Sequence, residues 1–220
     1  MTTEYRQPVY APPAGAADLY LIRHGESAPA RPGVSFPMKD GHGDPRLHPQ
    51  GERQAVAVGE RLKDHSFVAL YVTKLTRTHQ TAAPLAAHLG ATPIENPDLH
   101  EVHLGDWDGG LYRIKAAEGD PIYRRVIEIQ DWSPIPGAET RDAFFGRVRK
   151  GLFDIAHAHA GERVAVFVHG GVVGAALAMA SGSEPFAFLG AANGSISRLV
   201  IHDGRMSVRG FNDTQHLDHL

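Results

Sequence analysis

Two histidine-glycine pairs in this sequence each follow a short apolar run, and the first has an arginine directly before its histidine. The first is the tetrad Arg23-His24-Gly25-Glu26, and the second is His169-Gly170-Gly171. An imidazole can attack phosphorus as a nucleophile, and a neighbouring guanidinium can hold phosphate oxygens. We therefore interpret the two pairs as candidate parts of one site for phosphoryl chemistry.

The residues before each pair predict the elements that would position it. The runs 19–22 and 164–168 are apolar and end at glycine turns, a pattern typical of buried strands that deliver their last residues to loops. Ligands of an open α/β sheet bind beyond the carboxyl ends of its strands. Two strands of one sheet would thus bring His24 and His169 to the same pocket.

Two further segments offer the remaining groups that the chemistry needs. Arg77 opens a predicted helix directly after a predicted strand at 68–73, where unpaired amides and the helix dipole already favour an anion. Glu101 lies on a loop just before the glycine-aromatic turn Gly105-Asp106-Trp107-Asp108-Gly109. A carboxyl group there could protonate a leaving alcohol.

The rest of the chain alternates predicted strands with helices. Strands are expected at 18–22, 68–73, 163–168, 197–202 and 206–211, and helices at 50–65, 76–89, 120–130 and 138–160, with Pro84 kinking the second helix. Asp203-Gly204 predicts a tight turn between the last two strands. We predict an α/β fold, a three-layer α/β/α sandwich with a mostly parallel sheet and an antiparallel edge hairpin.

Composition limits the classes of protein and partner. The 220 residues contain 42% hydrophobic and 21% charged residues, which is ordinary for one globular domain. We predict that residues 1–17 form a disordered lead-in without the pattern of a signal peptide, and that 18–220 form a single domain. The formal net charge of -3 argues against nucleic acid or an anionic membrane as a partner. The absence of cysteine fits a cytoplasmic location, and the sequence leaves a homodimer open.

In order along the chain, these segments resemble the histidine phosphatase superfamily, also called the phosphoglycerate mutase-like family. The resemblance runs from Asp18 to Leu217 and includes the Arg-His-Gly signature at 23–25, the segment 75–82 around Arg77, the glycine-tryptophan turn after Glu101, and His169-Gly170. It implies the phosphoglycerate mutase-like fold and a phosphohistidine intermediate on His24. It further implies phosphate binding by Arg23, Arg77 and a protonated His169, and acid/base catalysis by Glu101.

The sequence also departs from the family pattern. Many members carry an asparagine six residues after the nucleophilic histidine, where this chain has Ala30 followed by Arg31. Either Arg31 or another residue replaces that donor, or fewer donors hold the phosphate. No cofactor or metal is implied, because side chains supply the positive charge. The pairs His100/His103 and His216/His219 lack a nearby third ligand, and the motif HExxH is absent.

We favour a phosphomonoester hydrolase that acts on a small phosphorylated molecule. A phosphoglycerate mutase is the alternative, and it would need further cations near Glu101; the candidates are Arg113, Lys115, Arg124 and Arg125. A phospho-ligand binding or signalling protein with little turnover is the second alternative. The presence of both His24 and Glu101 favours hydrolysis.

Overall fold

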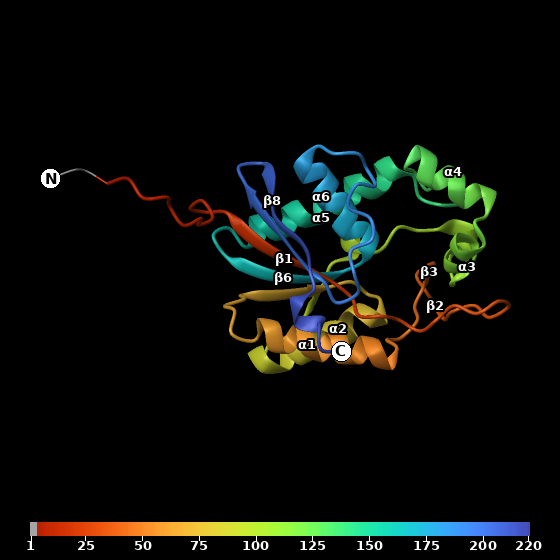
Figure 1. Cartoon of the computed structure of the whole chain (residues 1–220), viewed down its shortest axis with the longest axis horizontal. Helices are drawn as coiled ribbons and strands as arrows, with labels where there is room; N and C mark the ends of the chain where they lie inside the picture. Colours follow the sequence, from red (N-terminus) through yellow and green to blue (C-terminus); the bar gives the residue numbers. More distant parts are fainter. Residues whose placement is uncertain (1–3) are drawn as a thin grey trace.

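The computed structural model describes residues 4–220 and contains a six-stranded sheet with helices on both faces (Figure 1). The strand order is β5-β4-β6-β1-β7-β8. The strands are β1 (Ala17–Arg23), β4 (Ala69–Val72), β5 (Ile94–Glu95), β6 (Arg163–Val168), β7 (Ile196–His202) and β8 (Arg205–Asp213). The strands β1, β4, β5 and β6 run parallel, whereas β7 is antiparallel to β1, and β8 is antiparallel to β7. The predicted α/β class, mostly parallel sheet and antiparallel edge hairpin are confirmed.

Alternate residues of the central strand β6 enter two different cores, which makes the fold three-layered. Val164, Val166 and Val168 pack with the apolar residues of α5 (Arg141–Ala158) and α6 (Gly170–Ser181). Ala165 and Phe167 pack on the other face with α1 (Pro49–Leu62) and α2 (Thr76–Leu89). Because side chains alternate across a strand, a continuous apolar run is what a strand buried on both faces requires. Figure 1 shows α5 and α6 on one side of the sheet and α1 and α2 on the other.

The helix α3 (Leu111–Glu118) and a small hairpin are not among the elements that we predicted from the sequence. The helix α3 precedes α4 (Pro121–Ile129), which was predicted at 120–130, and the two helices form a cap beside the main sheet (Figure 1). A two-stranded hairpin pairs β2 (Met38–Lys39) with β3 (His42–Gly43). All of α3 keeps some surface exposed, and α4 buries only Val126. Weak burial explains why apolar periodicity did not reveal α3.

Several predicted boundaries move for local reasons. The helix α5 begins at Arg141 rather than 138, because Thr140 is its N-cap and accepts a hydrogen bond from the amide of Ala143. The helix α2 runs through Pro84 to its left-handed glycine cap at Gly90. Pro84 therefore does not end the helix. It packs closely against Gly59 of α1.

The segment before β1 was predicted to be a disordered lead-in. Residues 1–3 lie outside the described residues, and 4–16 contain no helix or strand. The ring of Tyr10 lies under the guanidinium of Arg209 from β8, with 3.4 Å between the guanidinium carbon and the ring centre. The domain boundary at residue 18 stays a prediction. Within residues 4–220, no helix has the length and apolar character needed to cross a membrane.

Candidate active site

The carboxyl ends of three neighbouring parallel strands carry the predicted site residues. Arg23 pairs with Val168 at the end of the β1–β6 ladder, so His24 and His169 follow adjacent strand ends. Their rings lie edge to face, with centres 5.2 Å apart. The strand β4 flanks β6 and leads into α2, which carries Arg77. The predicted meeting of these residues at one edge of the sheet is found in the structure.

The hydrogen bonds of His24 determine which ring nitrogen carries the proton. Its Nδ1 lies 2.7 Å from the carbonyl oxygen of Gly25, which can only accept, so Nδ1 carries the proton. Its Nε2 accepts a hydrogen bond from Nε of Arg77 at 3.2 Å. Burial, reinforced by Arg77 and Arg23, lowers the pKa of His24 well below its ordinary value. His24 is therefore a neutral imidazole with its Nε2 lone pair directed toward Arg77.

Close backbone packing holds the loop that follows His24. A Cβ on Gly25 would collide with the carbonyl oxygen of Gly51 at the start of α1. The backbone of the loop after His24 can therefore lie directly against the first turn of α1 only because both positions are glycine. The amide of Gly25 donates to Oγ1 of Thr81 at 3.0 Å, and the side chain of Asn193 donates to the carbonyl of His24 at 3.0 Å. These contacts prevent the imidazole from drifting away from the strand end.

Arg77 is buried, with 7% of its surface exposed, and is held by the loop before α1. Its Nη1 donates to the carbonyl of Gly43 at 2.9 Å and lies 3.9 Å from the carboxylate of Asp44. Asp44 in turn accepts from both the amide and the hydroxyl of Thr76. Burial lowers the pKa of Arg77 to about 10, against the opposing effects of Glu101 and Asp44. Arg77 thus remains a cation at neutral pH.

Arg23 has an unused donor that is already buried. Its Nη1 donates to the carbonyl of Ala191, whereas its Nε finds no hydrogen-bond partner anywhere in residues 4–220. Burial lowers the pKa of Arg23, and Glu101 opposes this effect. A buried N–H without a partner is costly, and an anion bound beside Arg23 would satisfy it.

His169 differs from its expected state. It is fully buried beside His24, and its Nε2 lies 3.0 Å from Oγ1 of Thr73. Its Nδ1 lacks a partner in the described part of the chain. Burial, together with Arg77 and His24, lowers the pKa of His169 well below the usual value. Burial therefore favours the neutral ring, whereas the mechanism inferred from the sequence expected a protonated His169.

Glu101 lies at the amino end of α6, with both carboxylate oxygens oriented by backbone amides. Oε1 accepts from the amide of Val102 at 3.0 Å, and Oε2 accepts from the amide of Gly171 at 3.1 Å. It lines the same cavity as His24 and Arg77. The carboxylate of Asp108, which lines the same cavity, has a structural role, since it accepts hydrogen bonds from the amides of Gly43 and Leu104.

Arg147 of α5 holds the loop that carries Glu101. Its guanidinium donates to three carbonyl oxygens of that loop, those of Asp98, His100 and Glu101, at 3.0, 2.7 and 2.8 Å. The same group makes two hydrogen bonds of 2.7 Å to the carboxylate of Glu139. A bidentate pair of this kind has a defined orientation, so it sets the backbone position of Glu101.

Arg113 of α3 is an additional cation at the site. It donates to the carbonyl of Ala28 at 3.0 Å and to the hydroxyl of Ser27 at 2.7 Å, and its guanidinium lies over the ring of Phe36. Its charge contributes to the lowered pKa of both Arg23 and His24. The neighbourhood of Ala30 is therefore occupied by Arg113, whereas Arg31 lies outside the cavity lining.

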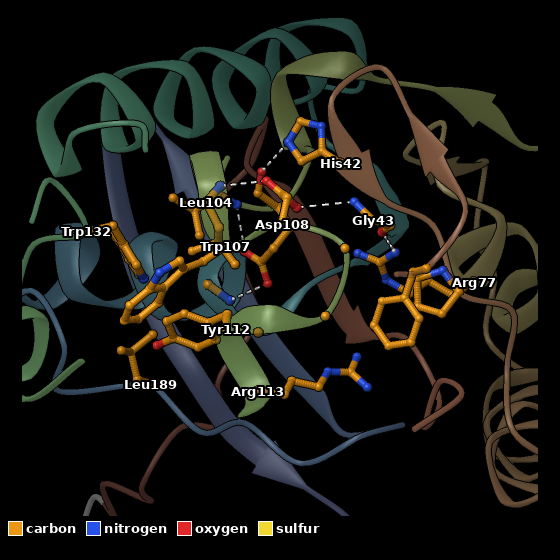
Figure 2. Close-up of a pocket in the computed structure, with 18 of the residues that line it drawn as sticks. His42, Gly43, Arg77, Leu104, Trp107, Asp108, Tyr112, Arg113, Trp132 and Leu189 are labelled. Atoms are coloured by element: carbon orange, nitrogen blue, oxygen red, sulfur yellow. Dashed lines mark hydrogen bonds between the residues drawn. The ribbon is translucent and has the colours of Figure 1, made fainter. Parts of the chain in front are cut away.

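One cavity joins these groups and has a volume of ≈ 500 Å³. Figure 2 shows Arg77, Arg113 and His42 at one side of it, and Trp107, Tyr112, Trp132 and Leu189 at the other. His169 lies behind the surface, adjacent to His24 and outside the lining. The site therefore has a cationic end that contains the imidazole nucleophile candidate and an end built from aromatic and aliphatic side chains.

The histidines that raised the question of a metal are engaged in local contacts. The amide of Lys74 donates to Nε2 of His100, and the amide of Gly105 donates to Nδ1 of His103. His42 places Nε2 3.1 Å from the carbonyl of Glu101. Across residues 4–220, three or more metal-ligating side chains are nowhere grouped so as to hold a metal ion.

Sequence reasoning selected the five central residues and missed those that support them. Arg113 appeared only as one of several cations after Glu101, and its neighbours in sequence do not indicate that it turns toward the site. Arg147 lies in no motif. Asp44 lies in a segment, Gly43-Asp44-Pro45-Arg46-Leu47, that resembles part of the family pattern, but the sequence does not indicate that it supports Arg77. Arg147 and Asp44 each act on a residue 30 or more positions away in the chain. Only the tertiary contacts identify them.

Comparison with known proteins adds independent information about this arrangement. A family model described as the histidine phosphatase superfamily (branch 1) matches residues 19–214. A metal-independent phosphoserine phosphatase of Arabidopsis thaliana is 34% identical over 205 residues, covering 91% of this chain and 83% of that protein. Phosphoglycerate mutase-like protein 4 of the same plant is 33% identical over 161 residues, covering 71% of this chain and 68% of that protein.

Among solved structures, a phosphoglycerate mutase from Bacillus anthracis superposes with a TM-score of 0.76 at 22% identity. The match covers 93% of this chain and 96% of that one. At this level of identity the likeness establishes the shared fold.

Proposed function

Because the chain belongs to the histidine phosphatase superfamily, we propose that it is a metal-independent phosphomonoester hydrolase that works through a phosphohistidine on His24. The observation that carries this proposal is the state of His24. It is neutral, its Nδ1 proton is held by a carbonyl, and its Nε2 lone pair faces a cationic pocket. A nucleophile directed at a phosphoryl group requires this tautomer.

In the first step, Nε2 of His24 attacks phosphorus while the bond from phosphorus to the ester oxygen breaks. Arg77 shifts its Nε–H from His24 to a phosphoryl oxygen, which frees the lone pair for the attack. Arg23 offers its unpaired Nε–H to another phosphoryl oxygen. His169 lies buried behind His24, so its expected part in phosphate binding stays a prediction. Preorganised donors of this kind stabilise the charge that develops on the transferred group. Glu101, carrying a proton, passes it to the departing alkoxide.

In the second step, Glu101 is a carboxylate and takes a proton from a water molecule, which attacks phosphorus. The bond from phosphorus to Nε2 breaks, and His24 returns to the neutral form, with its Nδ1–H still donating to the carbonyl of Gly25. Inorganic phosphate leaves, and Glu101 has regained its proton. The acid and base roles thus belong to one residue in alternate steps.

The positions of the other cations favour hydrolysis over a mutase reaction. Arg125 pairs with Glu128, and Lys115 pairs with Asp120, both away from the cavity. Within residues 4–220, Arg113 is the only one of the four candidate cations that lines the cavity. A bisphosphate would need a second cationic cluster at the far end of the pocket, where the lining is apolar.

The proposal is tested by trapping the intermediate. Protein mixed with a ³²P-labelled phosphomonoester is quenched at high pH, where phosphohistidine is stable, and the label is located. We expect label on His24 and none in His24→Ala, with normal labelling in the control His88→Ala, whose histidine is an exposed surface residue. Undiminished label in His24→Ala overturns the assignment.

We also propose a cytoplasmic location and a small phosphorylated molecule as substrate, with no nucleic acid or membrane partner. The absence of cysteine and the net charge of -3 support these proposals. Cell fractionation tests the location, and sedimentation of the purified chain tests whether it is a homodimer.

A further inference from the structure

The cavity is divided between a charged end and an uncharged end. The charged end contains Arg23, His24, Arg77, Glu101 and Arg113. A second part of the wall comes from α3, α4 and the segments around 132 and 189, and we call it the aromatic end; the segments 36–45 and 102–110 also line the cavity. It is lined by Tyr112, Tyr123, Ile127, Trp132 and Leu189. Figure 2 shows Tyr112, Trp132 and Leu189 gathered on this side, away from Arg77.

The aromatic end is a packed structure that exists before any ligand binds. The rings of Tyr112 and Tyr123 meet edge to face at 5.7 Å, and Trp107 packs on Tyr112 at 6.3 Å. Trp132 is 3% exposed and is wedged against Phe186. A preformed apolar surface binds apolar groups without the cost of ordering side chains first.

The charges around the aromatic end are already paired or face away from it. Arg125 and Lys115 are paired with carboxylates outside the cavity, and Arg124 is exposed and lies outside the lining. Arg113 directs both terminal nitrogens toward Ala28 and Ser27, on the side of the phosphate site. An ammonium or a carboxylate placed against Tyr123 and Leu189 would find no side chain of opposite charge there, so only the tyrosine hydroxyls and ring faces would offset the cost of its lost water.

We propose that the aromatic end binds the alcohol portion of the substrate, and that the preferred substrates are phosphomonoesters of uncharged, apolar alcohols. This inference rests on the proposed function, and it specifies the substrate class. It distinguishes this chain from an enzyme built for phosphoserine, the compound in the name of the plant relative, because phosphoserine carries two charges next to the ester.

Unbranched alkyl phosphates from ethyl to hexyl test the inference, since their leaving groups are nearly equal in basicity and differ in apolar length. Burial of each methylene favours binding, so kcat/KM is expected to rise roughly fourfold per methylene, and about 250-fold over the four methylenes of the series. Phosphoserine is expected to be hydrolysed less well than propyl phosphate, which has a three-carbon chain without the ammonium and carboxylate groups.

A pair of variants on α4 provides a matched comparison. Ile127 lines the cavity and is 42% exposed, whereas Ile122 is 36% exposed on the same helix and lies outside the lining. Both serine variants should fold, because neither side chain is in the core. Ile127→Ser is expected to lower the ratio of hexyl to ethyl phosphate hydrolysis at least threefold, and Ile122→Ser is expected to leave it unchanged. Leu189→Ser should act like Ile127→Ser.

The outcomes separate this inference from the proposed function. The inference is supported if kcat/KM increases with the length of the alkyl chain and Ile127→Ser reduces this increase. A flat series, or phosphoserine preferred tenfold over propyl phosphate, overturns it while hydrolysis and label on His24 preserve the proposed function. If neither alkyl nor aryl phosphates are hydrolysed and His24 takes no label, both proposals are overturned.

Discussion

Replacing Glu101 with glutamine tests how the site handles protons. The carboxylate accepts one hydrogen bond from the amide of Val102 and one from the amide of Gly171. Glutamine retains one accepting oxygen, so Glu101→Gln exchanges one of these bonds for a contact between two donors. The amide left without an acceptor costs about 1–3 kcal/mol, which lowers Tm by roughly 2–12 °C in a chain of this size. The variant should therefore fold, and changes in rate report on chemistry.

The expected rate loss depends on the leaving group. General acid catalysis contributes about 10² to 10⁴-fold, which corresponds to roughly 3–5 kcal/mol of barrier. An alkyl phosphate leaves as a basic alkoxide, so its hydrolysis should fall by that factor in Glu101→Gln. An aryl phosphate leaves as a stabilised phenolate and needs little protonation. Its transfer to His24 should be much less affected, giving a burst of phenolate followed by slow turnover, because water activation is also lost.

Two additional measurements decide whether the reasoning holds. Glu101 offsets the positive charge of Arg23 and Arg77, so its neutralisation should leave inhibition by vanadate at least as strong as in the parent. Asp106→Asn is the matched control, because Asp106 is exposed and lies outside the cavity lining. If Glu101→Gln lowers the rates on alkyl and aryl phosphates equally, and Asp106→Asn lowers the rate on alkyl phosphates more than on aryl phosphates, the acid role belongs to Asp106.

Four further predictions concern the supporting groups. Arg77→Ala should weaken vanadate inhibition and lower turnover by on the order of 10²-fold; unchanged inhibition would place Arg77 outside the phosphate site. Activity should survive excess EDTA, whereas loss restored by zinc or magnesium would show a metal requirement. Arg147→Met should lower kcat more for alkyl than for aryl phosphates, because it displaces Glu101, and an equal loss on both would indicate a purely structural role. Burial lowers the pKa of His100 to about 4, so between pH 6.5 and pH 4 this histidine is protonated in the unfolded chain and neutral in the folded one. The free energy of unfolding should therefore fall by up to about 2 kcal/mol from pH 7 to pH 5. Urea titrations of His100→Gln should show a smaller fall over the same pH range.

Local sequence patterns were sufficient for the central elements. The run 163–168 was predicted to be a strand and forms β6 with the same bounds, because a strand buried on both faces must be continuously apolar. The helix α2 likewise matches its prediction at 76–89, since apolar spacing and Gly90 define its face and its end. The strand ends then determine that His24 and His169 lie side by side, as parallel strands place their carboxyl ends at one edge.

Other features depend on contacts between residues that are distant in the chain. The neutral state of His169 results from burial beside Arg77 and His24, and a histidine-glycine pair in a sequence carries no information about burial. Arg113 turns toward the site because Ser27 and Ala28 accept its hydrogen bonds, and α3 has no apolar stripe that would predict this placement. The sequence alone was enough to select the residues that we propose for the phosphoryl chemistry. The tertiary structure decided their protonation, the cations that support them and the apolar wall opposite, because desolvation and hydrogen bonding arise only when separate segments pack together.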